Sequence, residues 1–188
     1  MRITGGEVKG RTLRFPSESR ERPTSDFLRE ALFNLLDSQQ DKRFLDLFAG
    51  SGSVGLEAAS RGAQEVYFLE KNAKLAAVIE KNIHECRFDG KCQVVINDVE
   101  KGLSRLFNKQ CVFDIIFADP PYNRNLAAKT LELLSQYPVY AGDSVIVMQH
   151  SVKENVTDFK GARIHLVDQR KYGENVLTFF KWRKDDAG

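Results

Sequence analysis

A glycine-rich turn, with Gly50, Gly52 and Gly55, follows a short apolar run and opens a segment of helical character. Glycines in this G-x-G-x-x-G spacing let the backbone turn tightly and come close to a bound ligand. Glu70 ends the next apolar run, twenty residues after Gly50. A carboxylate at that place can accept hydrogen bonds from both hydroxyls of a ribose. The turn, its flanking elements and the acid together predict a site for a nucleoside cofactor.

Asp46, just before the turn, discriminates between nucleoside cofactors. A nicotinamide dinucleotide would place its pyrophosphate on the amides of the turn, and a carboxylate there would repel it. S-adenosyl-L-methionine carries an ammonium group, a sulfonium group and no phosphate, so it suits Asp46. Asp98 can accept a hydrogen bond from an adenine amino group, and the alternative role for Asp98 is a helix cap. The sequence favours S-adenosyl-L-methionine.

The tetrad Asp119-Pro120-Pro121-Tyr122 follows another apolar run, FDIIFA. Two successive prolines fix the backbone and cannot continue a strand, so they hold the Asp119 carboxylate and a carbonyl oxygen in place. Two acceptors aimed at one point suit an amino group, and the Tyr122 ring offers a face on which a base can stack. A proline turn with an exposed tyrosine is the alternative for the tetrad alone. Combined with the glycine turn, the tetrad predicts methylation of an exocyclic amine on a nucleic-acid base.

These motifs resemble those of amino-methyltransferases that act on nucleic-acid bases. The N-terminal segment narrows the resemblance to the bacterial RsmD family, and the similarity spans essentially the whole chain. The N-terminal motifs that narrow it are Gly6, Lys9-Gly10-Arg11, Arg22-Pro23-Thr24 and Arg29-Glu30-Ala31-Leu32-Phe33. Lys171-Tyr172-Gly173, near the C-terminus, also fits this family. One departure is Gln149-His150, where acidic residues are expected in this family.

The resemblance implies methyl transfer from S-adenosyl-L-methionine to the N2 amine of a guanine in small-subunit (16S) ribosomal RNA. The implied partner is ribosomal RNA or the small-subunit particle, and the tetrad supplies the implied catalytic residues. The residues expected to hold the cofactor are Asp46, Phe48, Gly50, Ser51, Gly52, Glu70, Lys71, Asp98 and Val99. The residues expected to contact nucleic acid are Lys9, Arg11, Arg22, Thr24, Arg29 and Lys171.

Basic residues gather near both ends of the chain, although the net charge is only +2. Residues 160–184 contain seven basic residues against two acidic ones, and residues 1–29 contain seven against four. A basic patch is an electrostatic footprint for phosphate. Arg11, Arg22 and Arg29 are therefore candidate phosphate contacts. The alternative for each is an ordinary surface arginine or one that supports the core.

Three other functions share some of these features. A DNA adenine-N6 methyltransferase would carry the same tetrad, but such enzymes generally have an additional target-recognition segment, for which 188 residues leave little room. An NAD-type oxidoreductase is disfavoured by Asp46 and the tetrad. A nucleic-acid-binding module with an inactive site is disfavoured because the tetrad and the glycine turn are both intact.

Length and composition indicate one globular domain, with 188 residues, 42% hydrophobic and 29% charged. No apolar run approaches the roughly eighteen residues that cross a bilayer, and no apolar stretch of a signal peptide follows the N-terminus. We therefore expect a cytoplasmic protein without a membrane partner. Cys86, Cys92 and Cys111 are irregularly spaced and the histidines are scattered, so ordinary thiols and no metal are expected.

The elements that position these residues alternate along the chain. Strands are expected at 44–48, 66–69, 93–96, 113–118 and 145–148. Helices are expected between most of them, and Asn72 can cap one of these helices. Another helix precedes the strands, capped by Thr24 or Ser25 and ending near Ser38. This pattern predicts an α/β fold, a Rossmann-like, doubly wound and mainly parallel seven-stranded sheet. Each motif falls at the carboxyl end of a strand, where such sheets bind ligands.

The two ends of the chain complete this expected arrangement. The runs 163–167 and 176–182 have no helix between them, so they predict a terminal antiparallel hairpin with its turn at Tyr172-Gly173. The first fifteen residues predict a short hairpin around Gly5-Gly6 and Gly10. Residues 1–188 are expected to form a single methyltransferase domain, with 1–40 as a hairpin and helix extension and 41–188 as the catalytic core.

Overall fold

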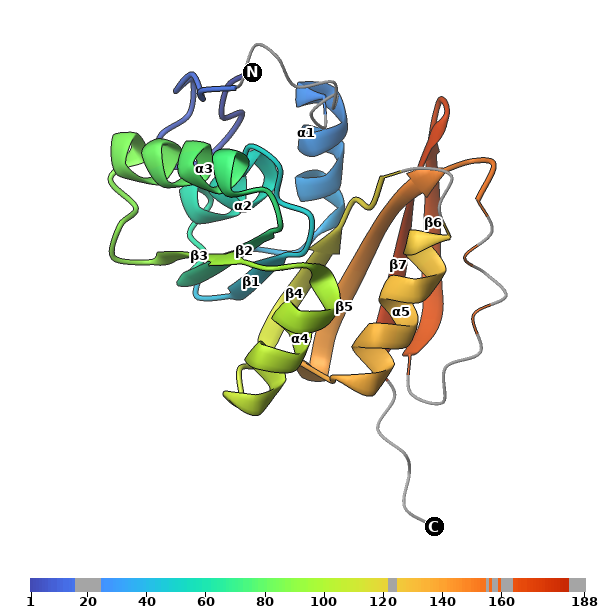
Figure 1. The fold of residues 1–188 in the computed structure, drawn as a ribbon. Coiled ribbons are helices and arrows are strands. Elements are labelled where there is room, and N and C mark those ends of the chain that lie inside the picture. Colours follow the sequence, from blue (N-terminus) through green and yellow to red (C-terminus); the bar gives the residue numbers. More distant parts are fainter. Residues whose placement is uncertain (16–24, 122–124, 155, 157–158, 160–163, 183–188) are drawn as a thin grey trace. The chain divides into compact units, whose positions relative to one another are not determined.

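The computed structural model describes residues 1–15, 25–121, 125–154, 156, 159 and 164–182 (Figure 1). Contacts between residues divide the chain into two compact units, Met1–Asp98 and Val99–Gly188. The single-domain organisation expected from the sequence stays a prediction. None of the helices in the part that the structure describes is long and apolar enough to span a membrane.

The first unit holds three parallel strands in the order β3-β2-β1, together with three helices (Figure 1). The strands are β1 (Arg43–Asp46), β2 (Glu65–Glu70) and β3 (Cys92–Ile96). The helices are α1 (Asp26–Leu35), α2 (Ser53–Ser60) and α3 (Ala73–Cys86). Phe44, Phe68 and Leu56 are fully buried, so β1, β2 and α2 contribute to one apolar core.

Side-chain caps mark where two of these helices begin. The Ser25 side chain accepts a hydrogen bond from the Leu28 N–H, and Asn72 accepts one from the Lys74 N–H, as an N-cap does. Both residues were predicted as caps. Helix α1 ends at Leu35, before the expected Ser38, and β1 ends at Asp46, before the expected Phe48. The residues after Asp46 belong to the turn that leads into α2.

The N-terminal segment is part of the core of the first unit. Its expected hairpin is reduced to one antiparallel bridge between Arg2 and Thr12, while Ile3 is buried to 1% exposure. Gly6 has φ +79°, and a Cβ on it would meet the Ser60 carbonyl oxygen at 1.9 Å. The adjacent Glu7 N–H donates to the same carbonyl at 2.7 Å. Glycine is required at position 6 because the turn lies directly against the end of α2.

Glu57 of α2 is a buried carboxylate that joins three parts of the first unit. Its Oε2 accepts hydrogen bonds from the Thr4 N–H at 2.8 Å and from Arg29 Nε at 3.1 Å. Its Oε1 accepts from Thr4 Oγ1 and from Arg61 Nε, both at 2.8 Å. Burial by itself would raise the pKa of Glu57, but the hydrogen bonds from Thr4, Arg61 and Arg29 outweigh it and hold that pKa below its ordinary value. The N-terminal segment, α1 and α2 therefore meet at one buried charge.

The second unit holds four strands in the order β4-β5-β7-β6 and two helices (Figure 1). Strands β4 and β5 are parallel, whereas β7 is antiparallel to both β5 and β6, which confirms the predicted terminal hairpin. Strands β5 and β6 are longer than expected. The strands are β4 (Phe113–Ala118), β5 (Tyr140–Ser151), β6 (Ile164–Tyr172) and β7 (Asn175–Trp182). The helices are α4 (Val99–Asn108) and α5 (Leu126–Gln136).

Helix α4 was not predicted from the sequence. Only Gly102, Leu103 and Leu106 of its residues are buried, so its apolar stripe is narrow and one side of the helix is polar. Val99, Leu103, Leu106 and Phe107 recur at helical spacing, a signal that could have predicted this helix. Phe107 also contacts Tyr137 at a ring-centroid distance of 6.1 Å. This helix occupies the interval between β3 and β4 that the sequence analysis left unassigned.

The cysteines differ in their burial. Cys86 and Cys92 are buried and Cys111 is half-buried. Burial raises the pKa of the Cys92 thiol to about 12 and also raises the pKa of the Cys86 thiol. Both buried thiols are therefore protonated near neutral pH and weakly nucleophilic. Within the described ranges, no group of three His, Cys, Asp or Glu side chains is placed to hold a metal ion.

Candidate active site

The glycine turn of the first unit connects the end of β1 to the start of α2. Gly52 has φ +81° and stands at the N-cap of α2 without a side-chain cap bond. Gly50 has φ +54°, and nothing lies within 4 Å of the position that a Cβ would take there. The backbone at Gly50 therefore faces open space, and its conformation is one that favours glycine. This turn can let a ligand approach the main chain.

Glu70, the last residue of β2, holds the glycine turn in place. Its Oε2 accepts a hydrogen bond from the Gly50 N–H at 2.9 Å, and its Oε1 accepts from the Asn72 N–H at 2.8 Å. The residue is 8% exposed. Each carboxylate oxygen can accept more than one hydrogen bond, so the predicted role toward ribose hydroxyls is chemically compatible with these contacts. That role stays a prediction.

Asp46 lies at the start of the turn and is only 1% exposed. Its Oδ2 accepts a hydrogen bond from the Gly55 N–H at 3.2 Å, in the first turn of α2. A helix N-terminus favours a negative charge, which stabilises the carboxylate at this buried place. The predicted contact of Asp46 with an ammonium group is not tested by this geometry.

Asn82 of α3 is a buried residue that the sequence analysis missed. Its Nδ2 donates to the Ser51 carbonyl of the glycine turn and to the Arg14 carbonyl, each at 3.1 Å. Its Oδ1 accepts from the Arg14 N–H at 2.8 Å. One amide side chain thereby connects the glycine turn to the N-terminal segment. One pattern in the sequence could have indicated that Asn82 is buried: it follows Ile79 by three residues and so lies on the apolar side of the helix.

The other residues predicted to bind the cofactor differ in exposure. Ser51 and Gly52 are buried, and Phe48 is half-buried. The Asn97 N–H donates to the Glu70 carbonyl at 3.2 Å, which brings the segment after β3 beside the end of β2. The remaining three lie at the surface or near it: Lys71 and Asp98 are exposed, and Val99, the first residue of α4 in the second unit, is half-buried.

The tetrad of the second unit follows β4 directly. Asp119 is half-buried, Pro120 is buried and Pro121 is exposed, while Tyr122 lies outside the described residues. Gln149 Nε2 donates a hydrogen bond to Asp119 Oδ2 at 3.1 Å. The parallel register pairs Ala118 with Met148, so the next residues along the two strands are neighbours.

This contact gives a role to Gln149, which departs from the acidic residue expected there. An amide donor holds the Asp119 carboxylate, whereas a second carboxylate at that distance would repel it. His150 belongs to the core instead. It is 2% exposed, with Nε2 2.8 Å from Thr178 Oγ1 and Nδ1 2.9 Å from the Ser151 carbonyl.

Comparison with known proteins identifies the family. The family described as conserved hypothetical protein 95 matches residues 1–181. YlbH of Bacillus subtilis (strain 168) is 32% identical over 184 residues, covering 97% of this chain and 100% of that protein. Ribosomal RNA small subunit methyltransferase D of Escherichia coli (strain K12) is 35% identical over 157 residues, covering 83% of this chain and 77% of that protein. The chain belongs to the RsmD-like methyltransferase family.

Solved structures support the same assignment. The Escherichia coli protein yhhF has a TM-score of 0.86 and 29% identity, covering 98% of this chain and 99% of that chain. A hypothetical protein of Thermus thermophilus has a TM-score of 0.79 and 34% identity, covering 95% and 98%. The predicted fold class, a Rossmann-like, mainly parallel seven-stranded sheet with a terminal antiparallel hairpin, is confirmed for this RsmD-like protein.

The residues that the sequence assigns to nucleic acid differ in accessibility in this RsmD-like chain. Lys9, Arg11 and Lys171 are exposed, so they can reach a phosphate. Arg22 and Thr24 lie outside the described residues.

Arg29 requires a correction, because its side chain is fully buried. Its guanidinium donates to Glu57 at 3.1 Å, to Asp26 at 2.9 Å and to the Arg2 carbonyl. A side chain enclosed in this way does not contact a phosphate at the surface. The alternative role given to Arg29 from the sequence, an arginine that supports the core, is therefore the correct one. Arg29 is not a contact for nucleic acid.

Gln149→Leu is expected to lower the turnover rate about tenfold to a hundredfold, because loss of the amide lets the Asp119 carboxylate leave its position. The Michaelis constant for the methyl donor should change little. Steady-state methylation over a range of donor concentrations measures both quantities. Gln169→Leu is the matched control, since Gln169 donates to Thr178 and not to Asp119. Equal losses in both variants would show that Gln149 only supports the sheet.

Proposed function

We propose that this RsmD-like protein methylates the exocyclic N2 amine of a guanine in small-subunit ribosomal RNA, with S-adenosyl-L-methionine as the methyl donor. The observation that carries the proposal is the match to ribosomal RNA small subunit methyltransferase D over 83% of this chain. The Asp-Pro-Pro-Tyr tetrad and the glycine turn supply the chemistry that such a reaction needs. A ribosomal RNA substrate also implies a cytoplasmic location.

The residues of the first unit fit S-adenosyl-L-methionine. The backbone at Gly50 faces open space, and the Glu70 carboxylate lies at the same turn with lone pairs suited to ribose hydroxyls. Asp46 places a negative charge at the start of the turn, which suits an ammonium group better than a phosphate. When bound, the cofactor supplies a methyl group on a cationic sulfur, which is an electrophile without further activation.

The second unit supplies acceptors for the amine. A guanine amine is a poor nucleophile, because its lone pair is delocalised into the ring. Asp119 accepts a hydrogen bond from this amine and stabilises the positive charge that develops on its nitrogen. The Pro120 carbonyl is a second acceptor in the proposal, and Tyr122 is the stacking surface. The target base leaves its stack to reach these groups, at a cost of about a few kcal/mol.

A second candidate is methylation of adenine N6. The tRNA1(Val) (adenine(37)-N6)-methyltransferase of Shewanella sp. (strain MR-4) is 35% identical over 81 residues, which covers 43% of this chain and 34% of that protein. Acceptors of the kind that Asp119 provides suit the amine of either base, so the tetrad alone does not choose between them. The longer match to the ribosomal RNA enzyme favours guanine in the small-subunit RNA.

The deciding experiment is transfer of labelled methyl groups to four substrates: naked small-subunit RNA, small-subunit particles, transfer RNA and DNA. Nucleoside analysis of the product follows. The proposal expects N2-methylguanosine from one of the first two substrates. N6-methyladenosine in the product, or label in DNA or transfer RNA alone, would replace it with the adenine alternative.

Glu70→Gln is expected to weaken binding of S-adenosyl-L-methionine by about 1.5–3 kcal/mol, the typical value of a hydrogen bond to a charged group. The amide both loses the charge and directs a donor toward backbone N–H groups that now donate to Glu70. Calorimetric titration measures the affinity. Glu65→Gln, at the other end of β2, is the control and should leave it unchanged. Full affinity in a folded Glu70→Gln variant would remove Glu70 from the cofactor site.

A further inference from the structure

Asn82 of α3 is a fully buried amide side chain that bonds to two separate stretches of backbone. Its Nδ2 donates to the Ser51 carbonyl of the glycine turn and to the Arg14 carbonyl of the N-terminal segment, each at 3.1 Å. Its Oδ1 accepts from the Arg14 N–H at 2.8 Å. Water does not reach the amide, so a bond lost on either side leaves a buried polar group without a replacement. A shift of one backbone stretch is therefore costly unless the other stretch follows.

The glycine turn packs against α3 beside this side chain. Ser51 is buried, and a Cβ on its neighbour Gly52 would meet the Ile79 side chain of α3 at 3.1 Å. The other neighbour, Gly50, has its backbone facing open space. A ligand that contacts the backbone at Gly50 therefore acts one residue away from the carbonyl that Asn82 holds.

The N-terminal segment is attached to the core up to the same contact. The Arg11 carbonyl accepts from the Ile3 N–H at 2.9 Å, and the Leu13 side chain is buried. Arg11, which is exposed and predicted to contact RNA, precedes Arg14 by three residues. The bonds from Asn82 to Arg14 therefore help to fix the backbone from which the Arg11 side chain extends.

We propose that Asn82 is a positioning residue that couples cofactor binding at the glycine turn to RNA binding by the N-terminal segment. The inference rests on the proposed function, which assigns the cofactor to the turn and the RNA to Lys9 and Arg11. A bound cofactor fixes the turn, and the fixed turn holds the Asn82 amide against Arg14. Part of the entropy cost of ordering the segment is then met before RNA arrives, so RNA binds more tightly to the cofactor-loaded protein. Since coupling is reciprocal, RNA also strengthens cofactor binding.

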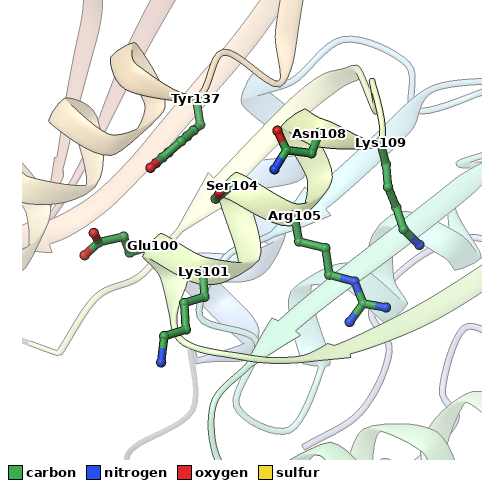
Figure 2. A pocket seen from close by; sticks show the side chains of 7 residues that line it. All are labelled: Glu100, Lys101, Ser104, Arg105, Asn108, Lys109 and Tyr137. Carbon is green, nitrogen blue, oxygen red and sulfur yellow. The ribbon is translucent and has the colours of Figure 1, made fainter.

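The first measurement uses the wild-type protein without RNA. Hydrogen exchange, resolved by residue with NMR, is compared with and without S-adenosyl-L-homocysteine, the cofactor that has lost its methyl group. The Arg14 amide should exchange about fivefold more slowly with this ligand, the lower end of the usual range for coupled sites. The control is the Lys109 amide, which donates to the Arg105 carbonyl at 3.1 Å where α4 ends, beside a groove of about 490 Å³ (Figure 2). It should exchange equally in both states.

Calorimetry on the same sample separates two kinds of failure. Ligand that binds without slowing exchange at Arg14 would overturn the coupling. A protein that does not bind the ligand would instead refute the cofactor assignment of the proposed function.

The second measurement is the ratio of affinities for naked small-subunit RNA with and without S-adenosyl-L-homocysteine. Wild-type protein should bind RNA about fivefold more tightly with the ligand. Asn82→Leu removes all three hydrogen bonds, and Arg14→Pro removes only the Arg14 N–H, so each should bring the ratio close to one. Arg14→Ala is the matched control. It loses the same guanidinium and its ion pair with Glu85 but keeps the N–H, so it should retain the wild-type ratio.

The ratio distinguishes coupling from a purely structural role, which would weaken both affinities by the same factor. Circular dichroism checks that each variant folds. Should Asn82→Leu fail to fold, Arg14→Pro decides, because it changes the backbone of an exposed residue. A wild-type ratio in the folded variants would contradict the proposal, as would loss of the ratio in Arg14→Ala. Failure of the wild-type protein to bind this RNA would count against the proposed substrate, while the exchange of the Arg14 amide would still test the link through Asn82.

Discussion

Asp119→Asn is expected to slow methyl transfer a hundred- to thousandfold, the usual effect of losing one preorganised electrostatic contact. The substitution keeps the shape of the side chain but removes the charge that favours a positive nitrogen. It can also turn an amide donor toward the target amine. Gln149 now donates to Asp119 Oδ2, so the asparagine must also choose between two orientations beside that amide. Asp119→Ala removes the acceptor entirely and should be at least as slow.

Single-turnover methylation with saturating cofactor measures the rate, and calorimetry measures cofactor affinity in the same variants. Affinity should hardly change, because Asp46, Glu70 and Asp98 are the residues assigned to that ligand. Asp143→Asn, an exposed aspartate of β5, is the control and should retain full activity. Near wild-type rates in both Asp119 variants would make the tetrad a structural turn. Parallel loss of affinity and rate would place Asp119 in the cofactor site.

Glu57→Gln is expected to lower the free energy of unfolding by about 3–5 kcal/mol, the cost of removing one carboxylate from a buried ion pair. Arg29 is fully buried beside Glu57, and the ion pair that it keeps with Asp26, at 2.9 Å, involves a carboxylate that is 44% exposed. Denaturant titration followed by circular dichroism measures the change. Glu65→Gln is the control, since its ion pair with Arg43 is partly exposed and should contribute less than about 1 kcal/mol.

The same carboxylate gives a pH dependence with a defined sign. The pKa of Glu57 is lowered in the folded state, so its contribution to stability is present above the ordinary glutamate pKa. This contribution disappears as the pH falls through the lowered folded-state pKa. The wild-type protein should therefore lose stability on acidification more steeply than Glu57→Gln does. Identical acid profiles for the two proteins would mean that Glu57 does not carry this charge when folded.

Local patterns predicted the elements with the clearest signals. The caps Ser25 and Asn72 and the strand β4 follow from adjacent residues, and the structure has them there. The hairpin turn predicted at Tyr172-Gly173 lies one residue later, at Gly173-Glu174, because Tyr172 still pairs with Asn175. Helix α4 was missed, although Val99, Leu103, Leu106 and Phe107 recur at helical spacing and mark its apolar side. The lengths of β5 and β6 were underestimated for a different reason. Strand pairing extends them through polar residues that apolar pattern alone does not mark.

The candidate site was predictable where a motif is contiguous and less so where side chains meet from distant positions. The glycine turn and Glu70 follow from spacing alone, although the sequence does not indicate that Glu70 holds the turn through Gly50. Asn82 and Gln149 act across 31 and 30 residues of sequence, and no local pattern reports such contacts. Arg29 shows the converse error. Its basic neighbourhood indicated a surface role, whereas the ion pair with Glu57, 28 residues away, places it in the core.

The hydrogen bonds from Thr4 to Glu57 limit where segments of this enzyme can be exchanged with those of a relative. The Thr4 N–H and hydroxyl both donate to the Glu57 carboxylate of α2. The backbone at Gly6 lies so close to the Ser60 carbonyl, at the end of that helix, that only glycine fits there. A chimera that takes its first forty residues from one relative and the remainder from another would pair donors and acceptors that were not selected together. Exchange of substrate preference between relatives should therefore tolerate a crossover after α2 better than one before β1. In engineering terms, the transferable module begins at the first residue and extends at least through α2, to Ser60.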